Sequence, residues 1–274
     1  MMTWLMTLIP LGGMWFLCLL AGWVISGNSG IVVVFATTLA GAVFLPRLPI
    51  RMVMKLMKGR PLPPQNAPGL YSHVARICER AELKSVPDLY LVDGPPNAFS
   101  SGSGRHSGLA ISSSLLSALR PEEVVAVLAH EIAHIKHGDV GLSRFAELLT
   151  RLGRVLAITG LAIAFVTVLL GERVEAPVWG LWILAFMPLI LTMLQLAQAR
   201  QREFLADETA ARLTGAPISM ARALHKIERG QKSPFRRLMS DITRSADIPP
   251  WLRTHPPTEA RIQRLLDLEN TRTS

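Results

Sequence analysis

The hydrophobic positions of this chain form long uninterrupted runs, unlike the short alternating patterns of a water-soluble domain. Residues 1–46 contain no Asp, Glu, Lys or Arg, and the runs Val155–Gly171 and Ala176–Ala199 are also uncharged. A helix needs about 20 apolar residues to cross a hydrocarbon core of about 30 Å. Each run reaches or nearly reaches that length with its flanking residues. The pattern therefore predicts an integral membrane protein.

The first run predicts a helical hairpin, with transmembrane helices at about residues 4–25 and 30–46 and a turn over Ser26–Gly30. A cleaved signal peptide is the alternative, but no basic segment precedes the apolar residues and a second span follows at once. The later runs predict a second hairpin, with helices at about 155–171 and 176–198. We therefore expect four transmembrane helices, separated and followed by the polar segments 47–154 and 200–274.

The basic residues predict the orientation. Of the 29 Lys and Arg residues, 14 lie in residues 47–154, 14 lie in residues 200–274, and one, Arg173, lies between them. Cytoplasmic loops beside membrane helices carry such an excess, so both termini and both polar segments are expected in the cytoplasm. The formal net charge is +9. No nucleic-acid motif accompanies it, which favours the bilayer as a partner and excludes nucleic acid.

The segment His130-Glu131-Ile132-Ala133-His134 carries the first candidate chemistry. Periodic apolar positions predict a helix from Pro121 to about Gly138, and residues at i and i+4 share one helix face. Two histidines spaced in this way can bind one Zn²⁺, with the intervening Glu131 as general base. The alternative is a chance occurrence of the pattern on an ordinary amphipathic helix.

A catalytic zinc site needs a third protein ligand. Glu203 and Asp207 form a second i, i+4 pair, so that one helix can offer Glu203 to the metal while Asp207 orients a ligand histidine. A solvated acid pair is the alternative for these two residues alone. Asp139 could also orient a histidine, or it could be a plain helix-terminal aspartate. Together the two pairs predict one zinc ion per chain, bound by His130, His134 and Glu203.

A small sheet is expected ahead of the zinc helix. After a proline-rich linker over Pro61–Pro68 and a helix over Gly69–Ala81, strands are predicted at Asp88–Asp93, Asn97–Ser100 and Ser107–Ser112. An exposed edge of such a sheet could hold an extended peptide by strand addition, with its scissile carbonyl near the metal. The fold class is thus an α-helical membrane protein with a mainly α, α+β protease domain.

Four motifs are similar to those of the HtpX-type membrane zinc metalloproteases, relatives of the CAAX prenyl endopeptidases. These motifs are P-N-A-F at 96–99, H-E-I-A-H at 130–134, R-E-F-L-A-D at 202–207 and H-P-P-T-E-A-R-I at 255–262. The resemblance implies a gluzincin-type domain facing the cytoplasm of a bacterial inner membrane. It also implies protein or peptide substrates and a role in quality control of membrane proteins. The alternatives are a CAAX-type processing protease and a catalytically silent scaffold.

The resemblance also assigns roles outside the zinc ligands. It places His255 and Arg261 near the site, where His255 would donate to the oxyanion and Arg261 would contact it or brace the helix of Glu203. A purely structural helix opening is the alternative for this motif. The P-N-A-F match makes Asn97, Ala98, Phe99 and Ser100 the candidate substrate-binding residues.

Overall fold

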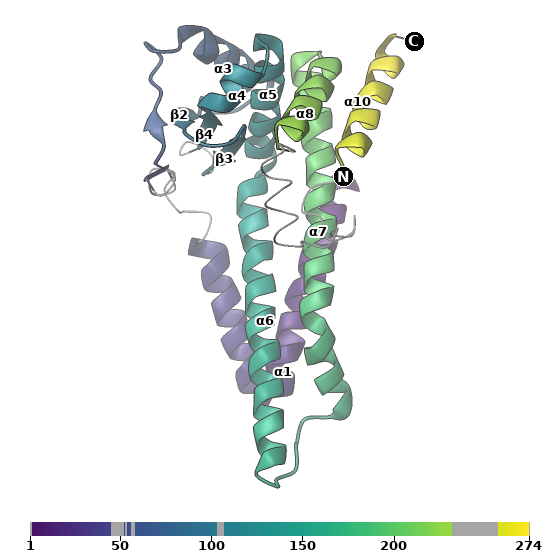
Figure 1. Cartoon of the computed structure of the whole chain (residues 1–274). Coiled ribbons are helices and arrows are strands. Elements are labelled where there is room, and N and C mark those ends of the chain that lie inside the picture. The colour runs from purple at the N-terminus through teal and green to yellow at the C-terminus, as the bar shows by residue number, and fades with distance from the viewer. Residues whose placement is uncertain are drawn as a thin grey trace. The chain divides into compact units, whose positions relative to one another are not determined.

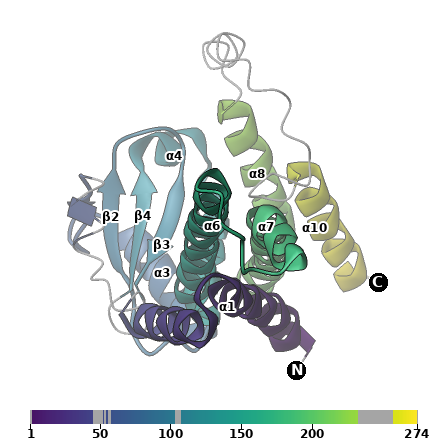
Figure 2. The same cartoon turned by 90° about the horizontal axis from the view of Figure 1, so that it is seen from below.

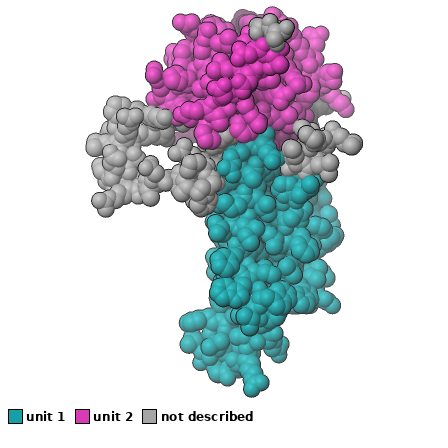
Figure 3. Space-filling view, turned by 90° about the vertical axis from the view of Figure 1, so that its right-hand side faces the viewer, with its two compact units in different colours: residues 1–46, 142–201 teal, residues 47–141, 202–274 magenta. Residues whose placement is uncertain are grey.

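The computed structural model describes residues 2–44, 52, 54–55, 58–102, 107–231 and 257–273. Most of these residues are helical, and a small mixed sheet lies near the middle of the chain (Figure 1). The chain divides into two compact units, residues 1–46 with 142–201 and residues 47–141 with 202–274, coloured separately in Figure 3.

The first unit begins with α1 (Met2–Phe44), which is two helices joined at a sharp reversal. Ser26 and Gly27 have non-helical backbone angles, and Trp15 Nε1 donates a hydrogen bond of 3.0 Å to Thr38 Oγ1. In a straight helix Trp15 and Thr38 would be about 34 Å apart, because the rise is about 1.5 Å per residue. The chain therefore folds back at Ser26–Gly27, the first two residues of the predicted turn.

Two glycines allow the halves of this hairpin to meet. A Cβ atom added at Gly22 would lie 2.7 Å from the carbonyl oxygen of Gly30, closer than any real side chain approaches. Small residues at such crossings let helix backbones come into direct contact in membranes. The apolar pattern alone predicts the hairpin, whereas this contact depends on the two glycines.

Among the described residues, three apolar helices are long enough to cross a membrane: Thr7–Phe44 within α1, α6 (Asp139–Leu169) and α7 (Val178–Thr214). Both α6 and α7 extend beyond the uncharged runs, so the helices are longer than the spans predicted from hydropathy. Within the first unit they enclose a core that includes Met14, Cys18, Leu149, Met187 and Leu191. Large apolar side chains such as Phe165 and Trp182 remain on the outer faces, as lipid-facing helices require.

The second unit contains a four-stranded sheet in the order β1-β2-β4-β3, with the three longer strands side by side in Figure 2. The strands are β1 (Arg60–Pro61), β2 (Asp88–Val92), β3 (Ala98–Ser101) and β4 (Gly108–Ser112). β2 and β4 are parallel, and β3 pairs with β4 in the antiparallel direction. The three predicted strands are confirmed. β1 falls partly in the expected linker, and Pro61 is tolerated because β1 lies at an edge of the sheet.

Helices complete the second unit. They include α3 (Pro68–Arg80), α4 (Ser113–Ala118), α5 (Pro121–His137), the end of α7 from Arg202 to Thr214, α8 (Pro217–Gln231) and α10 (Thr258–Thr273). α5 packs against β3, α3 and α8, and α8 packs against α10. Their shared core includes the fully buried residues Leu109, Ile111, Leu128 and Ile132. The helix that carries both histidines is therefore held on several sides.

Candidate metal centre

The helix α5 has well-defined ends that determine where its histidines lie. Pro121 occupies its first turn, and the Glu123 carboxylate accepts a hydrogen bond of 2.8 Å from the backbone N–H of Arg120. At the other end Gly138 adopts a left-handed conformation with φ 70° and terminates the helix. Since the intervening turns are regular, His130 and His134 lie on one face, as predicted.

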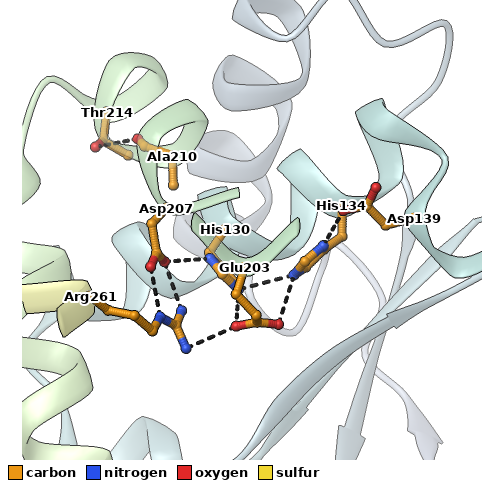
Figure 4. A network of polar contacts seen from close by, with 8 residues as sticks. All are labelled: His130, His134, Asp139, Glu203, Asp207, Ala210, Thr214 and Arg261. Carbon is orange, nitrogen blue, oxygen red and sulfur yellow. Dashed lines mark hydrogen bonds and ion pairs between the residues drawn. The ribbon is translucent and has the colours of Figure 1, made fainter. Parts of the chain in front are cut away.

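Three side chains bring potential metal ligands together (Figure 4). Nε2 of His130 lies 3.1 Å from Nε2 of His134, and these atoms lie 3.7 Å and 3.6 Å from the two carboxylate oxygens of Glu203. Four-coordinate zinc with ligands at about 2.0–2.2 Å separates them by roughly 3.3–3.6 Å. The three residues meet the geometric requirement for one metal ion.

The outer nitrogens of both rings face carboxylates. Asp207 Oδ1 lies 2.9 Å from His130 Nδ1, and Asp139 Oδ2 lies 2.6 Å from His134 Nδ1. A carboxylate at Nδ1 favours a proton on that nitrogen, so that Nε2 presents a lone pair. Two lone pairs then point toward each other and toward the Glu203 carboxylate. In this tautomer the three groups suit a cation, and a donor set of two imidazoles and one carboxylate fits zinc.

Arg261 of α10 contacts both acidic residues of α7. Its Nε and Nη2 donate hydrogen bonds of 2.7 Å to Asp207, and its Nη1 lies 2.9 Å from Glu203 Oε2 (Figure 4). Burial alone would raise the pKa of Asp207, but hydrogen bonds from Arg261 and His130 and the charge of Arg261 lower it below its usual value. The pKa of Arg261 is raised by Asp207 and Glu203, against the effect of its burial. Both groups are therefore ionised at neutral pH.

Among the described residues, acidic side chains outnumber arginines around the two histidines. Two buried arginines, Arg202 and Arg261, lie at the centre. Four buried or nearly buried acidic residues lie around the histidines: Glu131, Asp139, Glu203 and Asp207. With neutral histidines, the formal charges of these six described side chains sum to two negative charges. Uncompensated buried charge is strongly unfavourable, and a divalent cation would neutralise it.

The structure places the other predicted site residues as follows. Glu131 is 9% exposed beside the ligand histidines, within electrostatic reach of Arg261. Ala98, Phe99 and Ser100 form most of the edge strand β3, which packs against α5, and Asn97 precedes this strand. His255 lies outside the described residues.

One participant, Arg202, begins the motif R-E-F-L-A-D, but the sequence assigns it no role. Arg202 precedes Glu203, and its Nη2 contacts Asp139 Oδ1. An arginine next to a helix-borne glutamate is ordinary in sequence, and nothing there indicates that Asp139 is its partner. The only available hint is the placement of both residues next to predicted zinc-binding positions.

Comparisons with known proteins agree with this geometry. A sequence model described as peptidase family M48 matches residues 64–269. A protein named protease HtpX homolog from Persephonella marina is 31% identical over 281 residues, covering 96% of each chain. A protein of the same name from Aquifex aeolicus is 34% identical over 234 residues, covering 80% of this chain and 77% of that one.

A solved structure shares the fold. The crystal structure of S. mikatae Ste24p matches with a TM-score of 0.50 and 18% sequence identity, and the match covers 85% of this chain. It covers 57% of the other chain, so this chain spans little more than half the length of that protein. At this identity the likeness concerns the fold alone.

Proposed function

The chain belongs to peptidase family M48 and is a metalloprotease with membrane-spanning helices, and we propose that it is an endopeptidase using one zinc ion held by His130, His134 and Glu203. The observation that carries the proposal is the convergence of two histidine Nε2 atoms and the Glu203 carboxylate, close enough to bind one ion. The complete set of groups argues against a catalytically silent scaffold.

The proposed mechanism divides the work between the metal and the protein. When bound, zinc supplies a Lewis acid that polarises the scissile carbonyl and activates water. Glu131 accepts a proton from the attacking water and delivers it to the leaving amine. Its position next to His130 and its burial support this role, because a proton acceptor must lie close to the ligand atoms without occupying them.

Arg261 is proposed to brace the centre. All three of its nitrogens contact Asp207 or Glu203, which favours bracing over direct contact with the oxyanion. His255 is the proposed oxyanion donor. Its support is its position in the sequence, shortly before the helix that carries Arg261. A single such donor is typically worth about 2.7–4 kcal/mol.

The edge strand β3 is the proposed substrate-binding element. β3 pairs on one side with β4 and is the last strand of the sheet, so its other side can pair with an extended peptide. Strand addition would use the backbone of Ala98, Phe99 and Ser100, with Asn97 at the start. Its packing against α5 supports this role, because the zinc ligands His130 and His134 are on the same helix.

We further propose that the protein crosses the membrane four times with the metal centre in the cytoplasm. The reversal inside α1 divides the first long apolar helix into two spans, and the basic residues follow the cytoplasmic pattern. The HtpX homologs from Persephonella marina and Aquifex aeolicus support a bacterial plasma membrane. The proposed substrates are misfolded or damaged membrane proteins; CAAX-type processing is the alternative.

The decisive experiment compares Glu131→Gln with the unchanged protein after purification in detergent. We expect the variant to retain one zinc per chain and to lose cleavage of an unfolded protein such as casein. Glu122→Gln is the matched control, because Glu122 is an exposed residue of the same helix. Unchanged cleavage by Glu131→Gln would refute the proposed mechanism. Cleavage of prenylated peptides in preference to unfolded proteins would favour CAAX-type processing.

A further inference from the structure

Arg202 is a buried cation with one identified anionic partner. Its side chain is 7% exposed, and its Nη2 contacts Asp139 Oδ1. Among the residues that the structure describes, Nε and Nη1 of Arg202 have no hydrogen-bond partner. A buried guanidinium needs a compensating charge, and Asp139 supplies it. Arg202 lies beyond the uncharged run of α7, and burial lowers its pKa only to about 10. It remains charged at neutral pH.

Asp139 connects this arginine to a zinc ligand. One carboxylate oxygen, Oδ1, contacts Arg202, and the other, Oδ2, lies 2.6 Å from Nδ1 of His134. The carboxylate is 7% exposed, so little water competes for either oxygen. Asp139 follows directly after Gly138, whose left-handed conformation ends α5. The turn places the carboxylate next to His134, five residues earlier in the chain. Arg202 contacts the other oxygen of the same carboxylate.

The same order of groups occurs on the other histidine. There Arg261 binds Asp207 through two hydrogen bonds, and Asp207 contacts Nδ1 of His130. Each ligand histidine therefore has its own carboxylate and each carboxylate its own arginine. The two sets differ in detail. Arg261 binds Asp207 through two nitrogens and also contacts Glu203, whereas Arg202 contacts Asp139 through Nη2.

We propose that Arg202 is a positioning residue for the metal centre, which acts through Asp139 to hold the His134 ring with its Nε2 lone pair directed at the metal. This inference rests on the proposed zinc site. By fixing the rotamer of Asp139 and balancing its charge, Arg202 keeps the Nδ1 proton and the ring orientation that metal binding needs. Arg202 and Arg261 thus serve the two ligand histidines separately.

The test measures zinc affinity directly, by competition with a chromogenic chelator. We expect Arg202→Gln to weaken zinc binding about 10–100-fold, the usual cost of losing an outer hydrogen-bonding partner of a ligand. Arg202→Lys keeps the charge and should recover part of the loss. Arg212→Gln is the matched control, because Arg212 lies on the same helix and pairs with Glu208 at the surface. An affinity for Arg202→Gln within about two-fold of the unchanged protein would overturn the proposal.

Two further measurements separate positioning from general structural support. A merely structural role would lower the melting temperature with and without zinc equally, whereas a positioning role reduces the increment that zinc adds. In Asp139→Asn with Arg202→Gln, which removes both charges, we expect an affinity loss similar to that of the larger single loss. Losses that multiply would show that Arg202 acts independently of Asp139 and would contradict the proposal.

The outcomes also distinguish this inference from the proposed function. If the unchanged protein binds no zinc, or if Glu203→Ala binds it normally, the proposed zinc site fails and Arg202 has no ligand to position. If both behave as expected while Arg202→Gln binds zinc with unchanged affinity, only the role of Arg202 is refuted. Cobalt substitution gives an independent reading, because the visible absorption of bound Co²⁺ should change in Arg202→Gln and not in Arg212→Gln.

Discussion

The Nε2 atoms of His130 and His134 lie 3.1 Å apart, while the Nδ1 atoms of the same rings each face a carboxylate. With the protons held at Nδ1, two electron pairs point into one small space. Histidines that merely stabilise a core donate and accept within a closed network, and their lone pairs do not converge. The relationship between these two rings therefore identifies a cation site more strongly than their spacing in the sequence.

Glu203 is the proposed third ligand, and its removal should release the metal. Glu203→Ala leaves two protein ligands, one fewer than a catalytic zinc site uses, so we expect severe loss of bound zinc and of cleavage. Asp207→Asn should be milder, weakening zinc affinity by about 10–100-fold. Metal content by atomic absorption and chelator competition would check both. Stoichiometric zinc in Glu203→Ala would show that another residue is the third ligand.

Arg261 should affect metal binding more than the chemical step. Because it contacts Glu203 as well as Asp207, Arg261→Ala leaves two buried carboxylates without their partner, an arrangement that typically costs about 3–5 kcal/mol. We expect loss of zinc and a lower melting temperature, with partial recovery in Arg261→Lys. The measurement is zinc affinity followed by kcat at saturating zinc. A variant with full zinc affinity and a large loss of kcat would instead favour an oxyanion donor.

The candidate ligands His130, His134 and Glu203, which the structure brings together, could be picked out from sequence because they belong to two i, i+4 pairs on helices. That spacing is a local property, so His130 with His134 and Glu203 with Asp207 share faces whatever the rest of the fold does. The partnership of Arg202 with Asp139 depends instead on how α7 meets the end of α5, which no local pattern encodes. The short strand β1 was missed for a related reason, since two residues carry no periodicity.

The apolar helices show the same difference between features that a local pattern predicts and features that it does not. Uncharged runs predict the apolar helices well, because exclusion of charge from hydrocarbon is a strong and local requirement. The ends of α6 and α7 could not be obtained in this way, since a helix can continue into polar sequence after its apolar part ends. Hydropathy therefore predicts the membrane span but not the full length of the helix. α7 continues past its apolar part, and this continuation carries Glu203.

Glu123 joins two helices of the second unit and should make stability depend on pH. It accepts from the Arg120 backbone and lies 2.6 Å from Lys226 Nζ of α8, with its own side chain 1% exposed. Burial alone would raise the pKa of Glu123, but the Lys226 and Arg120 interactions lower it below 4.5. The stabilisation is therefore complete above pH 4.5 and is lost as the pH falls through the lower, folded-state pKa.

This predicts a specific pattern for Glu123→Gln. At neutral pH the variant should be less stable than the unchanged protein by about 1–3 kcal/mol, because it loses the charge-assisted hydrogen bond with Lys226 and keeps only a neutral cap on Arg120. Below pH 4.5 the difference should shrink, because the unchanged protein loses the same interactions. Thermal unfolding of zinc-free protein across this range provides the measurement, with Glu122→Gln as the control. A difference that stays constant with pH would show that the Glu123 charge contributes nothing.

The last prediction concerns orientation, because the side of the membrane that holds the zinc centre decides which proteins can be substrates. Basic residues flanking the spans favour the cytoplasm for residues 47–154 and 200–274, which leaves the turn near Asn28 and the loop containing Glu172 outside. The zinc ligands are divided between α5 and α7, separated in sequence by one membrane hairpin. An even number of crossings between them is required if both are to reach one ion.

Single cysteines placed at these positions in intact cells provide the test, in a background with Cys18 and Cys78 replaced by alanine. We expect an impermeant thiol reagent to label Asn28→Cys and Glu172→Cys. Lys84→Cys, an exposed position of the second unit, should be labelled only after the cells are permeabilised. Labelling of Lys84→Cys alone in intact cells would reverse the orientation, and substrates would then have to come from outside the cytoplasm. Labelling of Asn28→Cys and Glu172→Cys from opposite sides would contradict four crossings, because both lie at hairpin turns that this topology places on one side.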